Sequence, residues 1–180
     1  MCIRDRLLGY LGEVRKTSQE AREQLNAVQE GDGRWEKLRT IIDSGATVTV
    51  VPPWVGKCYS VQESPGSKAG VEYAVANGDS LPNLGQKALP LYTKEGTMRG
   101  MMAQVANVTD GLQSVRAMYN SGHIVVLDGP NSYALNKFTG EMNEIQDDGL
   151  NYTMESWICP PEELGTPEEL AAAGFAGQHP

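Results

Sequence analysis

An aspartate on a tight turn between two apolar runs is the feature that most constrains how this chain can fold. The turn is Asp43-Ser44-Gly45-Ala46, which follows Leu-Arg-Thr-Ile-Ile at residues 38–42 and precedes Thr-Val-Thr-Val-Val at residues 47–51. Both runs are rich in β-branched residues, which favour strands, and glycine permits a sharp reversal between them. The sequence therefore predicts that the Asp43 carboxylate is presented at the end of a strand.

The rest of the chain indicates an all-β domain with a single core. Its 180 residues are 40% hydrophobic, enough to bury one core, and its 20 glycines and 10 prolines punctuate short β-branched runs. Almost all of this strand signal falls within residues 34–158, which we expect to form the folded domain.

Both ends read as extensions of that domain. Residues 1–33 form a helical or flexible extension with apolar residues at partly helical spacing, and residues 1–6 resemble a translated adaptor, to which we assign no function. Residues 159–180 form an acidic, flexible tail in which the capping-box pattern at residues 166–169 predicts a short helix through Ala173.

Charge and cysteine content exclude several classes of function. The net charge is −8 and no Lys/Arg cluster stands out, so we expect no direct binding to nucleic acid. The three cysteines lack metal-ligand spacing, so no metal or cofactor is expected, and their odd number favours a reduced intracellular setting. No apolar stretch is long enough to span a bilayer or to act as a secretory signal.

The segments after the turn follow in a definite order. A strand at residues 71–75, the hairpin signal Asn77-Gly78 and a return strand at residues 81–92, with Gly85 as a bulge, predict a long hairpin. A turn at residues 94–97 leads into a strand at residues 98–108. A short helix around residues 112–118, closed by Ser121-Gly122, precedes a strand at residues 124–127. A final hairpin runs from Tyr133 through residues 137–140 into residues 152–158.

This order resembles that of the retropepsins, the aspartic proteases of retroviruses and retrotransposons. The fragments Val-Ala-Asn-Gly-Asp-Ser-Leu-Pro at residues 75–82, Leu-Gln-Ser-Val at 112–115 and Gly-His-Ile-Val-Val at 122–126 are similar to the protease region of copia-type retrotransposon polyproteins. The resemblance covers residues 38–158. Retropepsins commonly carry an apolar-apolar-Gly element before the helix, where this chain has Leu112-Gln113-Ser114.

The resemblance implies a closed β-barrel with a flap hairpin and one short helix, and the activity of an aspartic endopeptidase. That chemistry needs two facing carboxylates, one drawing a proton from the attacking water while the other protonates the carbonyl oxygen. Only Asp43 lies on a convincing turn, so we expect a homodimer in which Asp43 faces its own copy. Asp128 also follows an apolar strand, but Leu127-Asp128-Gly129-Pro130 reads as an ordinary strand-ending turn.

The neighbours of Asp43 have expected roles. Ser44 braces the two active-site loops in the family, Gly45 lets the backbone approach the carboxylate, and Ala46 leaves its amide available. An extended polypeptide substrate would pair with the flap as an added strand. The flap residues expected over it are Ala74, Val75, Ala76, Asn77, Gly78 and Asp79.

Three functional hypotheses follow from the sequence. The first is an endopeptidase that matures a retroelement polyprotein, in the cytoplasm or within retroelement particles. The second is a catalytically inactive retropepsin-fold module for dimerisation or peptide binding. The third is a monomeric β-barrel in which the turn motif arose by chance.

Overall fold

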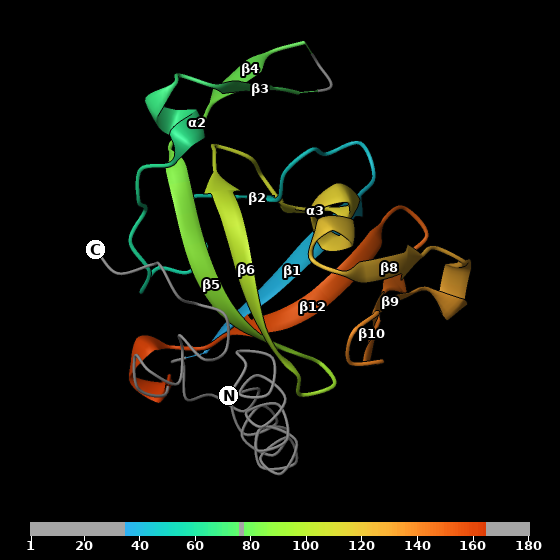
Figure 1. Ribbon diagram of the computed structural model, residues 1–180. Coiled ribbons are helices and arrows are strands. Elements are labelled where there is room, and N and C mark those ends of the chain that lie inside the picture. Colours follow the sequence, from blue (N-terminus) through green and yellow to red (C-terminus); the bar gives the residue numbers. More distant parts are fainter. Residues whose placement is uncertain (1–34, 76–77, 165–180) are drawn as a thin grey trace.

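The computed structural model describes residues 35–75 and 78–164, which are mostly β-structure built around a closed barrel of six strands (Figure 1). The order around the barrel is β1-β7-β2-β6-β5-β12, and pairing of β12 with β1 closes it. The short strand β11 (Gln146–Asp147) pairs in antiparallel fashion with the start of β12. The barrel strands are β1 (Glu36–Asp43), β2 (Val50–Val51), β5 (Gly85–Thr93), β6 (Met98–Val105), β7 (Gly111–Ser114) and β12 (Tyr152–Ile158).

Alternating side chains explain how the strands form the barrel wall. In β1, Leu38, Thr40 and Ile42 are buried while Lys37 and Arg39 are exposed, the period of two expected for a strand with one covered face. The longest pairing joins β5 to β6 around a turn at residues 94–97, as predicted.

Two hydrophobic clusters hold the molecule together. The first fills the barrel and includes Leu89, Val51 and Val105, which are fully buried. The second contains Ile42 and Met154 from the barrel, and Met118 and Ala134 from a second layer. That layer comprises helix α3 (Val115–Asn120) and a three-stranded sheet of β8 (His123–Val126), β9 (Tyr133–Asn136) and β10 (Met142–Glu144).

The structure confirms the prediction of an all-β barrel, the hairpin signalled by Asn77-Gly78 and a short helix before β8. The helix begins at Val115, because Leu112, which was expected to lie in it, belongs to strand β7 and pairs with β1 and β2. The predicted final hairpin has its first strand and its turn in the expected places, but its return strand is wrong, because β9 pairs with β10 whereas β12 returns to the barrel. Five of the seven residues of β12 are buried, and a central place between β1 and β5 covers them better than an edge hairpin would.

Other boundaries also differ from expectation. The return strand is interrupted at residues 83–84, between β4 (Ser80–Pro82) and β5, and the strand predicted for residues 98–108 ends at Val105. Among residues 35–75 and 78–164, α3 is accompanied by a second helix, α2 (Pro65–Lys68), and two 3₁₀ turns, η1 (Gly129–Asn131) and η2 (Pro161–Glu163), where one short helix was expected. Helix α2 buries none of its residues, so it has no apolar periodicity to detect.

The predicted helices at both ends lie outside the described residues. Within the part of the chain that the structure describes, we find no helix long and apolar enough to cross a membrane.

Candidate active site

Asp43 is the last residue of β1, and the turn after it folds back onto its carboxylate. Its Oδ1 accepts hydrogen bonds from the backbone N–H of Gly45 at 2.7 Å and of Ala46 at 3.2 Å. A Cβ atom at Gly45 would lie 3.3 Å from that oxygen, a tight contact that glycine avoids. Asp43 is half-buried and Ser44 is exposed, so the turn holds a carboxylate at an accessible place.

Strand β7 passes between the two strands that flank this turn. It runs parallel to β1, with Ser114 opposite Asp43, and antiparallel to β2, with Leu112 opposite Val50. The segment from Asp43 to Val50 therefore bridges β7 instead of forming a hairpin. Pairing with β7 therefore fixes the end of β1, including Asp43, along one edge.

Ser114 holds the turn to the helix. Its hydroxyl donates to the carbonyl of Ala46 at 2.6 Å and accepts the N–H of Ala117 at 3.1 Å, which caps α3. Its own N–H donates to Oγ1 of Thr49 at 3.2 Å. Sequence reasoning missed this role, although a serine just before a helix is a recognisable capping signal.

Gln113 occupies the position at which the resemblance to retropepsins led us to expect an apolar residue. Its Oε1 accepts a hydrogen bond from the hydroxyl of Thr40 in β1 at 2.9 Å. The Leu112-Gln113-Ser114 element thus joins β7 to β1 by a side-chain bond as well as by strand pairing.

The predicted flap is a hairpin of β3 (Glu72–Ala74) and β4. Near its tip, the N–H of Val75 donates to the carbonyl of Asp79 at 3.0 Å and the N–H of Gly78 to that of Val75 at 2.9 Å. Gly78 has a φ of +90°, which glycine adopts easily. Ala74, Gly78 and Asp79 are exposed and Val75 is half-buried, whereas Ala76 and Asn77 lie outside the described residues.

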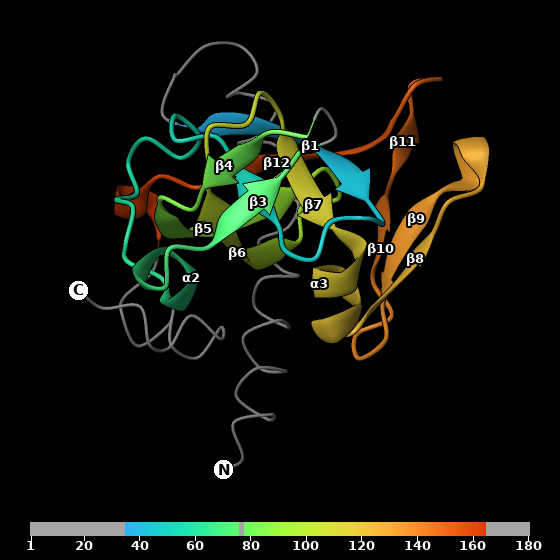
Figure 2. The ribbon, with the colours of Figure 1, turned by 90° about the horizontal axis from the view of Figure 1, so that it is seen from above.

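The hairpin and the aspartate turn lie at the same end of the barrel. Figure 1 shows β3 and β4 above the end at which β1 stops, and the view from above in Figure 2 places them over the barrel. Asp128, in contrast, follows β8 in the separate three-stranded sheet. Its N–H donates to Oγ of Ser132 at 2.8 Å, within the local turn around η1.

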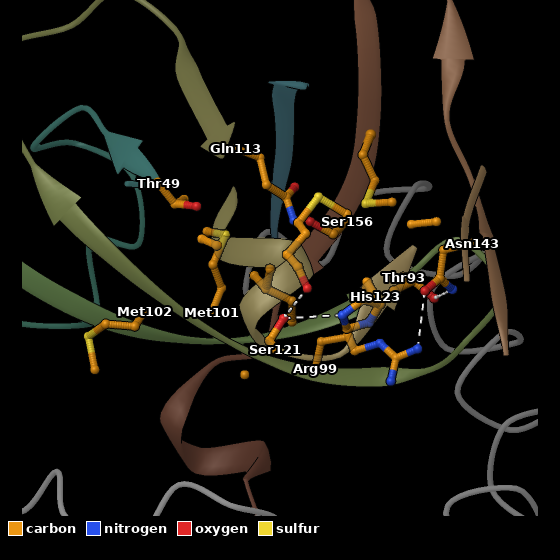
Figure 3. Close-up of a pocket in the computed structure, with 16 residues that line it drawn as sticks. Thr49, Thr93, Arg99, Met101, Met102, Gln113, Ser121, His123, Asn143 and Ser156 are labelled. Atoms are coloured by element: carbon orange, nitrogen blue, oxygen red, sulfur yellow. Dashed lines mark hydrogen bonds between the residues drawn. The ribbon is translucent and has the colours of Figure 1, made fainter. Parts of the chain in front are cut away.

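A pocket of about 280 Å³ lies between the barrel and the second layer, and Figure 3 shows its lining. Thr49, which accepts the N–H of Ser114, and Gln113, which accepts the hydroxyl of Thr40, form part of its wall, but none of the predicted site residues lines it. Arg99 donates to Oδ1 of Asn143 at 3.2 Å, and Oγ of Ser121 lies 3.2 Å from Nδ1 of His123. Burial, assisted by the charge of Arg99, lowers the pKa of His123.

No metal centre accompanies these features in residues 35–75 and 78–164, where no three His, Cys, Asp or Glu side chains are grouped to hold an ion. A scan against protein-family models finds no match, and neither curated proteins nor solved structures give one.

Proposed function

We propose that the chain is an aspartic endopeptidase of the retropepsin type that cleaves peptide bonds of a retroelement polyprotein. The observation that carries this proposal is the Asp43 turn, in which backbone N–H groups bind the carboxylate and Ser114 binds the carbonyl of Ala46. Its carboxylate ends a barrel strand, receives two backbone N–H groups, and lies at the barrel end that the β3–β4 hairpin overlies. The family assignment rests on the resemblance in sequence.

The chemistry requires a second carboxylate. Asp128 lies in the loop after β8, on the separate three-stranded sheet, so the proposal assigns the second group to Asp43 of an identical chain across a two-fold axis. One ionised carboxylate then takes a proton from water as the water attacks the peptide carbonyl, while its protonated partner donates to the carbonyl oxygen. The amides of Gly45 and Ala46 orient each carboxylate.

Substrate binding would use the backbone of the hairpin. An extended peptide laid below β3 and β4 can pair as an added strand, with alternate side chains entering pockets on either side. Exposed Ala74 and Gly78 add little bulk near the tip, which would leave room for such a segment.

The test is cleavage of a peptide library by the full chain, compared with Asp43→Asn and Asp128→Asn. We expect Asp43→Asn to reduce turnover by at least about a thousandfold and Asp128→Asn to leave it within about twofold. Equal activity of wild type and Asp43→Asn, or no cleavage by wild type, would contradict the proposal. A dimer without cleavage would favour the inactive binding module instead.

Mixing the chains tests the shared site. If each active site uses two copies of Asp43, a freely exchanging equimolar mixture of wild type and Asp43→Asn should show about one quarter of the activity of the same total amount of wild type. A mixture that retains about half would place the whole site within one chain.

A further inference from the structure

Asn83 lies at the joint between the hairpin and the barrel. It follows β4 and precedes β5, and its side chain is buried. Its backbone N–H donates to the carbonyl of Val71 at 3.0 Å, which closes the base of the hairpin just before β3. Asn83 therefore closes the base of the hairpin and connects its second strand to β5.

The side-chain amide of Asn83 connects three separate parts of the fold. Its Nδ2 donates to the hydroxyl of Tyr73 in β3 at 2.8 Å and to Oε1 of Gln104 in β6 at 2.9 Å. Its Oδ1 accepts the N–H of Gly85, at the start of β5, at 2.8 Å. The two shortest hydrogen bonds of this NH₂ group thus reach the hairpin and the barrel wall, and Oγ of Ser64 is a third, longer acceptor.

Helix α2 leaves this amide little room to turn. A Cβ atom at Gly66 would lie 2.7 Å from Nδ2 of Asn83, and Oγ of Ser64 lies 3.4 Å from the same nitrogen. Ser64 is itself fixed, because it forms a reciprocal capping box with Ser67. Gly66 and Ser64 therefore pack against the amide, while the amide binds Tyr73 of the hairpin and Gln104 of the barrel.

We propose that Asn83 is the residue that positions the β3–β4 hairpin on the barrel, through the bridge Tyr73–Asn83–Gln104. It is a positioning residue, since it acts through the hairpin. The mechanical part of this inference stands on the geometry alone. Its consequence for substrate binding rests on the proposed function.

The test is amide hydrogen exchange on the full chain with Tyr73→Phe, Asn83→Ala and the double variant. Tyr73→Phe deletes only the acceptor of the hairpin arm, so exchange of hairpin amides at residues 72–80 should accelerate by about fivefold, the effect of one hydrogen bond of about 1 kcal/mol. Asn83→Ala should accelerate it at least as much. The double variant should be no faster than Asn83→Ala, because both changes break the same bridge.

The matched control is Ser80→Ala. It removes an exposed hydrogen bond within the same hairpin, from Ser80 Oγ to Glu72 Oε2 at 2.6 Å, without touching the joint. Its exchange should stay within about twofold of wild type. Amides of β5 and β6 should keep their wild-type exchange in Tyr73→Phe.

The inference is overturned if Tyr73→Phe leaves hairpin exchange unchanged, if it loosens β5 and β6 equally, or if the accelerations of the single variants multiply in the double variant. If Asn83→Ala does not fold, the comparison of Tyr73→Phe with Ser80→Ala still tests the inference. In a cleavage assay, Tyr73→Phe should raise KM more than it lowers kcat. Loss of the proposed activity altogether would leave the exchange result standing, so the two failures are distinguishable.

Discussion

The hydroxyl of Ser114 lies 2.6 Å from the carbonyl oxygen of Ala46, which ties the first turn of helix α3 to the turn that follows Asp43. Because the same hydroxyl caps the helix, Ser114→Ala removes two interactions at once. We expect it to lower the free energy of unfolding by about 2 kcal/mol, from the lost cap and an unpaired carbonyl. Urea denaturation measures this loss. Ser121→Ala, at the exposed end of the same helix, should cost less than about 1 kcal/mol, and an equal loss in both variants would contradict the assignment.

Lys87 is buried, and its ammonium group donates to the carbonyls of Pro53 at 2.9 Å, Val55 at 2.7 Å and Gly56 at 3.3 Å. Lys87→Met keeps the apolar stem but removes the ammonium donor, which leaves the buried carbonyl of Val55 without this bond, while that of Gly56 keeps the N–H of Tyr59. We expect a loss of about 2–4 kcal/mol in chemical denaturation. The exposed Lys57→Met should stay within about 0.5 kcal/mol, so similar values for both would refute the argument.

Gly85 and Gly140 both have positive φ, at +133° and +74°, but only Gly85 is crowded. A Cβ atom there would lie 2.4 Å from the carbonyl oxygen of Gln62, whereas nothing lies within 4 Å at Gly140. Gly140→Ala should therefore cost about 1 kcal/mol from backbone strain, and Gly85→Ala at least about 2 kcal/mol more. Thermal unfolding of the two variants measures the difference. Both variants carry the backbone strain, so the extra loss in Gly85→Ala reports the steric clash, and equal melting temperatures for the two variants would contradict the clash.

Burial lowers the pKa of His123 in the folded chain, so the unfolded chain binds the proton more readily. The stability that His123 contributes is complete above its unfolded pKa of about 6.5 and is lost as the pH falls below that value. We expect wild type to lose more stability than His123→Gln between pH 7.5 and pH 5. Urea titrations of both at the two pH values measure the difference, and parallel losses would contradict the predicted linkage.

Local sequence patterns predicted the elements whose structure depends on residues close together in the chain. Residues 38–42 are rich in β-branched residues and end at an aspartate, and Asn77-Gly78 signals a tight reversal, so β1 and the β3–β4 hairpin were predictable. The pairing of β12 with β1 and β5 was not, because a strand buried on both sides gives no sign of which strands flank it.

The candidate site likewise has a part that the sequence predicted and a part that only the fold reveals. Asp43, Ser44, Gly45 and Ala46 were found as a contiguous motif. Ser114 reaches the turn across 68 residues of sequence, and Asn83 joins β3 to β6 across 10 and 21 residues, so neither contact falls within one local motif. Such side chains become informative only once the strands that bring them together are known.

The passage of β7 between β1 and β2 has a consequence for how the protein is made. The contact from Ser114 to the Asp43 turn spans 68 residues of sequence, and contacts that close such long loops form late in folding. A nascent chain leaving the ribosome exposes Asp43 well before the strand that secures it has been translated. We therefore expect the carboxylate to acquire its fixed geometry only after synthesis has passed β7, so the order of translation itself delays assembly of the site.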